Sequence, residues 1–438
     1  MKTKDCAVKS LKRLLLPSLI STTLAVSGMV SAGPLADLYQ LALENDPQLK
    51  RAEALFLAGQ EAPVQGKAGL LPQIGFSART NRNAESLNTG SSNYGISLEQ
   101  PVFNAAAYYG FQSSLLSADK STIEFSKAEQ EIIIRSVTAY LEVLRSMSAL
   151  DNAEAQERAL QRRLDQVNAQ FEVGLIAITD VQEAQAAYDL AAVQRIDALG
   201  SLDNSFQALE RLAGQSFNDL AYLNSEYPIL AVEPSDPQPW LEKALQNNLS
   251  LQIVETETEI SRRDVQVAQG NRLPKVNLSI TNTNSRFHGS GSSNWNDDNQ
   301  VTLSMNVPIF SGGDLLSKQR QAEHRQIAAV HNAEDVRREI TEGTRTLLRT
   351  LQTSAQGVKA RQQSILSRET ALRATEEGFN VGTRNVVDVL QAEQNLFEAR
   401  REYENARINH INALFQFKQT IGTLSPDDLF ALDEWLVD

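Results

Sequence analysis

The sequence Phe171-Glu-Val-Gly-Leu-Ile-Ala-Ile-Thr-Asp-Val-Gln182 returns in altered form as Phe379-Asn-Val-Gly-Thr-Arg-Asn-Val-Val-Asp-Val-Leu390 in this chain of 438 residues. Other stretches recur at a similar offset of about two hundred residues. Leu71-Pro72 returns as Leu273-Pro274, and Gln100-Pro-Val-Phe103 returns as Val307-Pro-Ile-Phe310. Because the order is kept, we interpret the chain as one structural plan written twice.

Both copies pass through the same order of hydrophobic patterns. In the first, a helical stretch from Leu35 to Gly69 precedes two segments with apolar residues at every second position, which predict strands joined near Gly90. A long helix from Ala105 to about Asn168 follows, and after the turn at Gly174 another helix runs from Ile178 to Ala213. The second copy predicts helices from Trp240 to Gly270, from Leu315 to about Phe379, and from Val386 to Ile421.

These patterns divide the chain into five segments. They are a signal peptide over 1–32, a first structural repeat over 33–225 (helix, β-hairpin, long helix, helix), a linker over 226–239, a second structural repeat over 240–424, and a C-terminal tail over 425–438. Four prolines interrupt the linker, so we expect the linker and the tail to be the least regular parts.

The first segment has the features of a secretory signal. Five basic residues lie between Lys2 and Arg13, an apolar stretch runs from Leu14 to Val30, and Val30-Ser-Ala32 has the small residues of a cleavage site. Cleavage there would place the mature N-terminus at Gly33. A membrane anchor is the alternative, but polar residues and a proline interrupt the apolar stretch, which makes it too short and polar to span a bilayer.

Composition argues against several functions. The only cysteine, Cys6, lies in the leader, so the mature chain has no thiol for a disulfide, a metal or a nucleophile. The formal net charge of −13 argues against a nucleic-acid partner. The four histidines lack the spacing of metal ligands, and no helix with a lysine follows Gly289-Ser-Gly-Ser-Ser293 as a phosphate-binding loop requires. We therefore predict no enzyme activity, no cofactor and no metal.

The predicted strands have one apolar and one polar face. The apolar positions are Ile74, Phe76, Ala78, Tyr94, Ile96, Leu98, Val276, Leu278, Ile280, Val301, Leu303, Met305 and Val307, and polar residues such as Ser77 and Thr281 lie between them. About eleven residues per strand, tilted near 40°, rise roughly 28 Å, which matches a bilayer core. Because a barrel needs about eight strands, four per chain require two, three or four chains. A soluble sheet is the alternative, but the polar second face leaves no core to pack on.

Helix length completes the architecture. A helix of about sixty-five residues is roughly 95 Å long, which exceeds a globular domain. Each repeat therefore predicts a pair of long antiparallel rods, with a β-hairpin at one end and a glycine-containing turn at the other.

The repeated motifs resemble those of the TolC family of outer-membrane channels. The resemblance rests on the two Phe-X-Val-Gly motifs with their following Asp-Val, and on Pro101-Val-Phe103 and Pro308-Ile-Phe-Ser-Gly-Gly313, and it extends from about Leu35 to Leu429. It implies a mainly α fold with transmembrane β structure: a trimeric, twelve-stranded β-barrel continued by an α-helical coiled-coil barrel. The linker and tail would form an equatorial collar around the helices.

The resemblance also implies a function and partners. It predicts a homotrimer in the outer membrane of a Gram-negative bacterium, with outer-membrane lipid around the barrel and a periplasmic extension. Substrates would arrive from an inner-membrane RND or ABC transporter through a periplasmic adaptor protein, for drug efflux or type I protein secretion.

Gate residues follow from the same resemblance. Asp388 matches an aspartate ring at the periplasmic mouth, where three carboxylates would attract cations. Gln391 stands where the family has a second aspartate, so we expect weaker block by cations. An isolated aspartate at a helix start is more simply explained by capping and by the helix dipole, and the twin Asp180 also fits that interpretation.

A closed tip would need latches between the helices. By resemblance the latch residues are Arg163, Thr179, Asp180, Glu376, Phe379 and Arg384. Thr179 and Asp180 would bond Arg384 of a neighbouring subunit. Arg163 would face Glu376 within one subunit, which can compensate for the tyrosine hydroxyl that Phe379 lacks. Such exposed pairs contribute about 0–1 kcal/mol each, and Arg163 and Glu376 are equally well explained as solvated helix charges.

Turns and prolines complete the assignments. The turns Gly174-Leu175 and Gly382-Thr383 resemble the adaptor-contacting tips, and glycine termination of a helix explains them equally well. We expect strand–helix junctions at Pro72, Pro101, Pro274 and Pro308, because proline ends strand pairing and disfavours helix just before it.

Two other functions remain open. A trimeric surface adhesin or stalk normally carries one barrel segment at the end of the chain, whereas here both hairpins interrupt helices mid-chain. A soluble periplasmic coiled-coil scaffold would not require detergent for its extraction.

Overall fold

The computed structural model describes residues 33–83, 89–217, 220–289 and 294–437, and the predicted signal peptide lies outside this part of the chain. The helices are α1 (Pro34–Asn45), α2 (Pro47–Gln60), α3 (Ala62–Ala68), α4 (Ala105–Glu172), α5 (Ile178–Ala213), α6 (Gln238–Asn247), α7 (Leu249–Gly270), α8 (Asp314–Asn380), α9 (Val386–Thr420) and α10 (Pro426–Asp433). The strands are β1 (Gln73–Arg82), β2 (Gly90–Phe103), β3 (Tyr222–Leu223), β4 (Lys275–His288), β5 (Asn296–Asn306) and β6 (Leu436–Val437).

Strands β1, β2, β4 and β5 form one antiparallel sheet in that order. Residues directly opposite each other in antiparallel strands have side chains on the same face. The register produces an apolar row of Ile74, Leu98, Ile280 and Val301, and the next row, on the opposite face, is Gly75, Ser97, Thr281 and Gln300. The sheet therefore has the two chemically different faces that the sequence predicts. Val307, which we expected in the last strand, lies just after β5.

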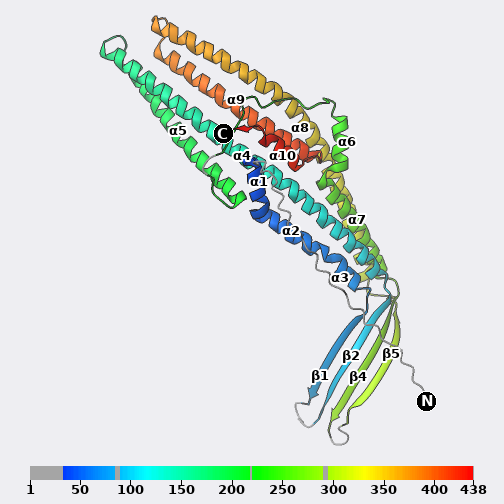
Figure 1. Ribbon diagram of the computed structural model, residues 1–438. Coiled ribbons are helices and arrows are strands. Elements are labelled where there is room, and N and C mark those ends of the chain that lie inside the picture. Colours follow the sequence, from blue (N-terminus) through cyan, green and yellow to red (C-terminus); the bar gives the residue numbers. More distant parts are fainter. Residues whose placement is uncertain (1–32, 84–88, 218–219, 290–293, 438) are drawn as a thin grey trace, which may run out of the picture. The chain divides into compact units, whose positions relative to one another are not determined.

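Two very long helices carry the rest of the chain. α4 has 68 residues and α8 has 67, so each is about 100 Å long. The side chain of Asn104 caps α4 by accepting a hydrogen bond from the Ala107 N–H at 3.1 Å. α4 packs against α5, α7 and α9, and α8 packs against α6, α7 and α9. Figure 1 shows the four-stranded sheet at one end of these helices and the α4–α5 and α8–α9 turns at the other.

The shorter helices before each hairpin differ from the prediction. We expected one helix over 35–69, but the chain forms α1, α2 and α3, with a break at Asp46. Asp46 caps α2 by accepting hydrogen bonds from the Gln48 and Leu49 N–H groups, and its neighbour Pro47 cannot continue the preceding helix. Asn248 likewise caps α7 and divides the expected helix over 240–270 into α6 and α7.

The main hydrophobic core brings together α1, the first described helix, and α10, the last. Its buried residues include Leu35 and Leu38 of α1, Tyr140 of α4, Leu209 of α5, Ile411 of α9 and Leu429 of α10. The Tyr140 hydroxyl donates to the Ala221 carbonyl at 2.9 Å. The C-terminal tail that we expected to be irregular is therefore ordered, because α10 packs its apolar face here and β6 pairs with β3.

Three of the four prolines lie between elements, and one does not. Pro72 and Pro274 directly precede β1 and β4, and Pro308 lies between β5 and α8. Pro101 instead lies inside β2, opposite Asn277 of β4, with a register irregularity between Pro101 and Phe103. The strand tolerates it because β1 pairs with β2 only as far as Glu99, so Pro101 has a neighbouring strand on one side alone.

Within the described ranges, no helix combines the length and the apolar character needed to cross a lipid bilayer.

Candidate gate at the helical tips

The candidate site lies where α4 turns into α5 and where α8 turns into α9 (Figure 1). We call residues 173–177 and 381–385, with the helix ends that flank them, the tip. The tip contains all residues that the sequence assigns to the gate ring, the latch and the adaptor-contacting turns.

Both turns are built around a glycine in the left-handed region. Gly174 has φ 75° and Gly382 has φ 81°, and apart from the adjacent residues no atom in the described ranges lies within 4 Å of a Cβ placed on either glycine. Backbone conformation, not lack of space, therefore requires glycine. The Leu175 N–H donates to the Gln170 carbonyl at 2.9 Å and the Thr383 N–H to the Gly378 carbonyl at 2.8 Å, which ends both helices in the same way. Leu175 and Thr383 are exposed at the ends of the turns.

The twin aspartates lie in the first turns of α5 and α9. Asp180 accepts a hydrogen bond from the Ala177 N–H at 3.4 Å, and Asp388 accepts one from the Asn385 N–H at 3.3 Å. The Asn385 side chain in turn accepts from the Asp388 N–H at 2.8 Å. Both aspartates therefore have the structural role at a helix start that their sequence position predicts.

The Asp388 carboxylate is also placed to interact with charged groups. Its carboxylate remains partly exposed, with the Arg384 guanidinium 3.8 Å away in the same chain. Gln391, one turn further on, is exposed, and its amide donates to the Asn395 side chain at 3.3 Å. Thr179 is exposed near the start of α5.

A buried charge cluster joins α4 to both α8 and α9, and we call it the tip cluster. Arg163 of α4 is 8% exposed, and its Nη2 donates to Glu376 Oε1 of α8 at 2.5 Å and to Glu393 Oε1 of α9 at 2.9 Å. Arg163 Nη1 also donates to Gln166 at 2.8 Å. The expected contact between Arg163 and Glu376 is present, but the interpretation of Arg163 as a solvated helix charge is wrong, because packing at the helix interface buries it.

Glu393 has the more unusual environment within the tip cluster. It is 5% exposed, and its Oε2 atom has no hydrogen-bond partner among the described residues. Burial raises the pKa of the Glu393 carboxyl, and the Arg163 guanidinium opposes this effect without cancelling it. When it is ionised, Glu393 shares the guanidinium of Arg163 with Glu376.

A buried apolar cluster also lies at the tip. The buried residues are Leu164 and Val167 of α4, Val181 and Ala184 of α5, and Val386 of α9. Phe379 packs against this group, so its ring has a packing role where the family's tyrosine would offer a hydroxyl. The tip therefore combines an apolar contact among four helices with a charge cluster that has one cation and two carboxylates.

Comparison with known proteins identifies the family. The family model described as "Outer membrane efflux protein" matches residues 38–215 and 240–423. The chain belongs to this outer membrane efflux protein family. This membership favours a channel over the adhesin and the periplasmic scaffold that the sequence left open.

Individual relatives of the efflux family agree with this result. The chain is 33% identical to the outer membrane protein TolC of Vibrio cholerae, over 96% of this chain and 98% of that protein. It is 31% identical to TolC of Escherichia coli, over 96% and 89%, and 30% identical to the alkaline protease secretion protein AprF of Pseudomonas aeruginosa, over 90% and 85%.

Solved structures share the fold. The crystal structure of CusC matches with a TM-score of 0.76 at 17% identity, over 89% of this chain and 92% of that one. The Campylobacter jejuni CmeC outer membrane channel matches with a TM-score of 0.74 at 17% identity, over 92% and 89%.

Sequence reasoning missed Glu393, although a signal was present. Val386, Val389, Glu393 and Leu396 follow the three-four spacing of a buried helix seam, and Glu393 interrupts an otherwise apolar series. Arg163 is not itself a seam residue but directly precedes the seam residue Leu164. A negative charge in one seam and a positive charge next to another indicate an ion pair between the helices.

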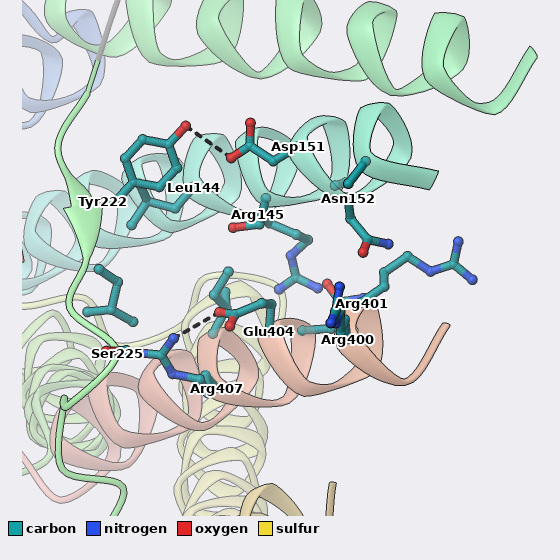
Figure 2. Close-up of a pocket in the computed structure, with 16 residues that line it drawn as sticks. Leu144, Arg145, Asp151, Asn152, Tyr222, Ser225, Arg400, Arg401, Glu404 and Arg407 are labelled. Carbon is teal, nitrogen blue, oxygen red and sulfur yellow. Dashed lines mark hydrogen bonds and ion pairs between the residues drawn. The ribbon is translucent and has the colours of Figure 1, made fainter. Parts of the chain in front are cut away.

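A second polar feature lies between α4 and α9, near β3. It is a cavity of about 400 Å³ whose lining includes Arg145, Arg400 and Arg407 (Figure 2). Each of these arginines has a partner within the chain: Asn409 at 2.8 Å, Glu369 at 2.8 Å and Glu404 at 2.9 Å, respectively. We therefore interpret this cavity as a structural junction between the strand and the two helices.

Across the part of the chain that the structure describes, no group of three or more His, Cys, Asp or Glu side chains could hold a metal ion.

Proposed function

We propose that this efflux-family protein is the outer-membrane exit duct of a tripartite efflux pump or of a type I secretion system. It acts as a passive conduit, not as an enzyme, and opens and closes at its periplasmic tip. The observation that carries the proposal is a four-stranded sheet with an exposed apolar face on the same chain as two helices of about 100 Å.

The apolar face of the sheet supports a place in the lipid. Ile74 is 74% exposed and Val301 is 71% exposed, and both belong to the row that crosses all four strands. An apolar face of this kind in water favours aggregation, whereas lipid covers it without cost. β1 has ten residues and β5 has eleven, so with a tilt near 40° each rises about 25–30 Å.

The edges of the sheet support a shared barrel. β1 and β5 are the outer strands, so each offers one unpaired side to another chain. We propose that three copies join β5 to β1 in a closed ring of twelve strands, and that the long helices continue this ring as a coiled-coil tunnel. In this arrangement the segments 33–225 and 240–424 act as two structural repeats, and the linker over 226–239 and the tail over 425–438 form the collar.

The partners follow from the relatives. The family is named for efflux, and two relatives, AprF and PrtF, are named for secretion of proteases. We propose that the exposed turns at Gly174-Leu175 and Gly382-Thr383 contact a periplasmic adaptor, and that an RND or ABC transporter in the inner membrane delivers the substrate.

The gate rests on two parts of the tip. Asp388 from each copy forms a carboxylate ring at the mouth, and the neutral Gln391 leaves half the charge that two aspartate rings would have. Between copies, Arg384 bonds Thr179 and Asp180; within a copy, the tip cluster holds the α8–α9 pair against α4. Opening moves α8 and α9 away from α4 and breaks both contacts.

Single-channel recording in planar bilayers tests the ring. Three carboxylates about 8 Å apart repel by roughly 0.5 kcal/mol per pair, so a multivalent cation that binds among them is stabilised. We expect Asp388→Asn to reduce cation selectivity and block by multivalent cations, and Gln391→Asp to strengthen that block. Asp189→Asn, an exposed aspartate further along α5 that has no part in the ring or the latch, is the matched control and should change the block less than Asp388→Asn.

The recordings separate the two levels of the proposal. Unchanged selectivity and block in Asp388→Asn would remove Asp388 from the gate while leaving the channel in place. A wild-type protein that forms no conducting pore in lipid would reject the exit duct itself.

A further inference from the structure

The first turn of α1 meets the last turn of α10, although these segments are 398 residues apart. Asp433, the last residue of α10, accepts a hydrogen bond from the Leu35 N–H at 2.9 Å. The backbone N–H groups of Gly33 and Ala36 also favour the charged form of this carboxyl. The Asp433 carboxylate therefore faces the backbone at the start of α1.

With Asp433 in this position, only glycine fits at position 33. A Cβ placed on Gly33 would lie 2.1 Å from Asp433 Oδ2 and 2.5 Å from its carboxyl carbon, so the carboxylate occupies the space of a side chain. Pro34 follows and begins the helix, where its missing N–H leaves nothing unsatisfied. The carboxylate thus lies directly against the backbone of Gly33.

Among the residues that the structure describes, no basic side chain forms an ion pair with Asp433. It is 9% exposed, and burial raises the pKa of its carboxyl. The three N–H groups lower this pKa but do not offset the burial, and the nearby Asp37 carboxylate raises it further. A cation at the site would stabilise the charged carboxylate more than the backbone dipoles do.

We propose that Asp433 binds the ammonium group that removal of the leader would create on Gly33. Hydrolysis of the Ala32–Gly33 peptide bond consumes one water, leaves a carboxylate on the leader and converts the Gly33 amide nitrogen to an ammonium. The new positive charge then lies on the residue against which the Asp433 carboxylate already packs. The inference depends on the predicted cleavage after Ala32 and is independent of the gate.

The ion pair would fasten the mature N-terminus to the C-terminal helix. Leu429 and Leu432 of α10 already share one buried core with Leu35 and Leu38 of α1. The ion pair exists only after the leader is removed. It therefore stabilises the packing of α1 against α10 only in the exported protein.

Labelling of the α-amino group tests the proposal on the purified, detergent-solubilised mature protein. The intact mass first identifies the mature N-terminus. Reductive dimethylation is then followed by mass spectrometry near pH 8, where an ordinary α-amino group is about half deprotonated. The exposed Lys50 amine is the internal reference, and a synthetic peptide with the sequence Gly-Pro-Leu-Ala is the reference for an unbound α-amine.

We expect the Gly33 amine of the wild type to react about fivefold more slowly than that of Asp433→Asn, because at pH 8 a rise of one unit in a pKa of about 8 lowers the deprotonated fraction from about one half to about one tenth. Asp427→Asn, an exposed aspartate on the same helix, should behave like the wild type. Gly33→Ala should react as fast as Asp433→Asn, because its methyl group displaces the carboxylate.

Two results would overturn the proposal. One is a mature N-terminus at a residue other than Gly33. The other is a wild-type Gly33 amine that reacts as fast as the synthetic peptide, a comparison that holds even if a variant fails to fold.

Discussion

Replacement of Arg163 by methionine should open the tip, because it leaves a buried carboxylate without its counter-charge. Methionine keeps the apolar stem of the side chain, so the change removes mainly the charge. Glu393 is 5% exposed and lies 2.9 Å from Arg163 Nη2. Loss of one partner from a buried ion pair costs about 3–5 kcal/mol, whereas the half-exposed Glu376 adds only about 0–1 kcal/mol. A cost of about 3 kcal/mol raises the ratio of open to closed tips roughly a hundredfold.

Protonation of Glu393 limits this cost, so the pH dependence of opening provides a second readout. The pKa of Glu393 is raised, so the closed tip binds the proton more tightly than an open, hydrated tip does. The closed tip therefore gains stability as the pH falls from neutral toward the ordinary glutamate pKa of about 4.3. Arg163→Met removes the group that opposes the rise, so its open fraction should fall more steeply than that of the wild type as the pH is lowered from neutral.

The assay is the fraction of time that single channels spend open in planar bilayers, together with the sensitivity of cells to antibiotics too large for a closed tip. Arg158→Met, an exposed arginine on α4, is the matched control and should behave like the wild type. The double variant Arg163→Met/Glu393→Leu removes both buried charges and should close again, without the pH dependence. Arg163→Met channels that open no more than those of Arg158→Met would refute the reasoning.

Two further predictions concern stability. Gly382→Ala should lower the free energy of unfolding by about 1 kcal/mol, because φ is 81° there, whereas Gly343→Ala, inside α8 with open space around it, should raise it by about 0.5–1 kcal/mol. Denaturant titrations in detergent measure both, and equal effects would contradict the role of the turn. Burial lowers the pKa of His410, whose Nδ1 lies 2.7 Å from the Ser354 hydroxyl. The unfolded chain therefore takes up protons first below about pH 6.5, and the unfolding midpoint of the wild type should fall more between pH 7 and pH 5 than that of His410→Gln.

Periodicity predicts most of the helical architecture because long uninterrupted patterns have few competing structures. The helix predicted from Ile178 to Ala213 has these bounds in the structure, and the two longest helices extend only a few residues beyond their predicted ends. The register of the sheet follows from apolar alternation, since a shift by one residue would turn every side chain to the other face.

The remaining differences between prediction and structure come from single side chains whose effect depends on which parts of the fold lie next to them. Asp46 and Asn248 end helices because their side chains cap the next helix, and helix-rich composition around them concealed this. α10 forms because its apolar face packs against α1, which is almost four hundred residues earlier in the sequence. Glu393 is a charged residue in a seam, and only the packing of α4 against α9 gives it a partner.

The central claim is that separate copies join their outer strands into one wall, and disulfide cross-linking tests it most directly. The mature chain has no cysteine once the leader with Cys6 is removed, so an engineered pair reports alone. Ser77→Cys on β1 is combined in turn with Asp298→Cys, Gln300→Cys or Thr302→Cys on β5, which lie on the same polar face. We predict that at least one pair gives covalent oligomers ending at trimers on denaturing gels, whereas the single variants stay monomeric. Monomers from every pair, or disulfides that close only within one chain, would contradict the account.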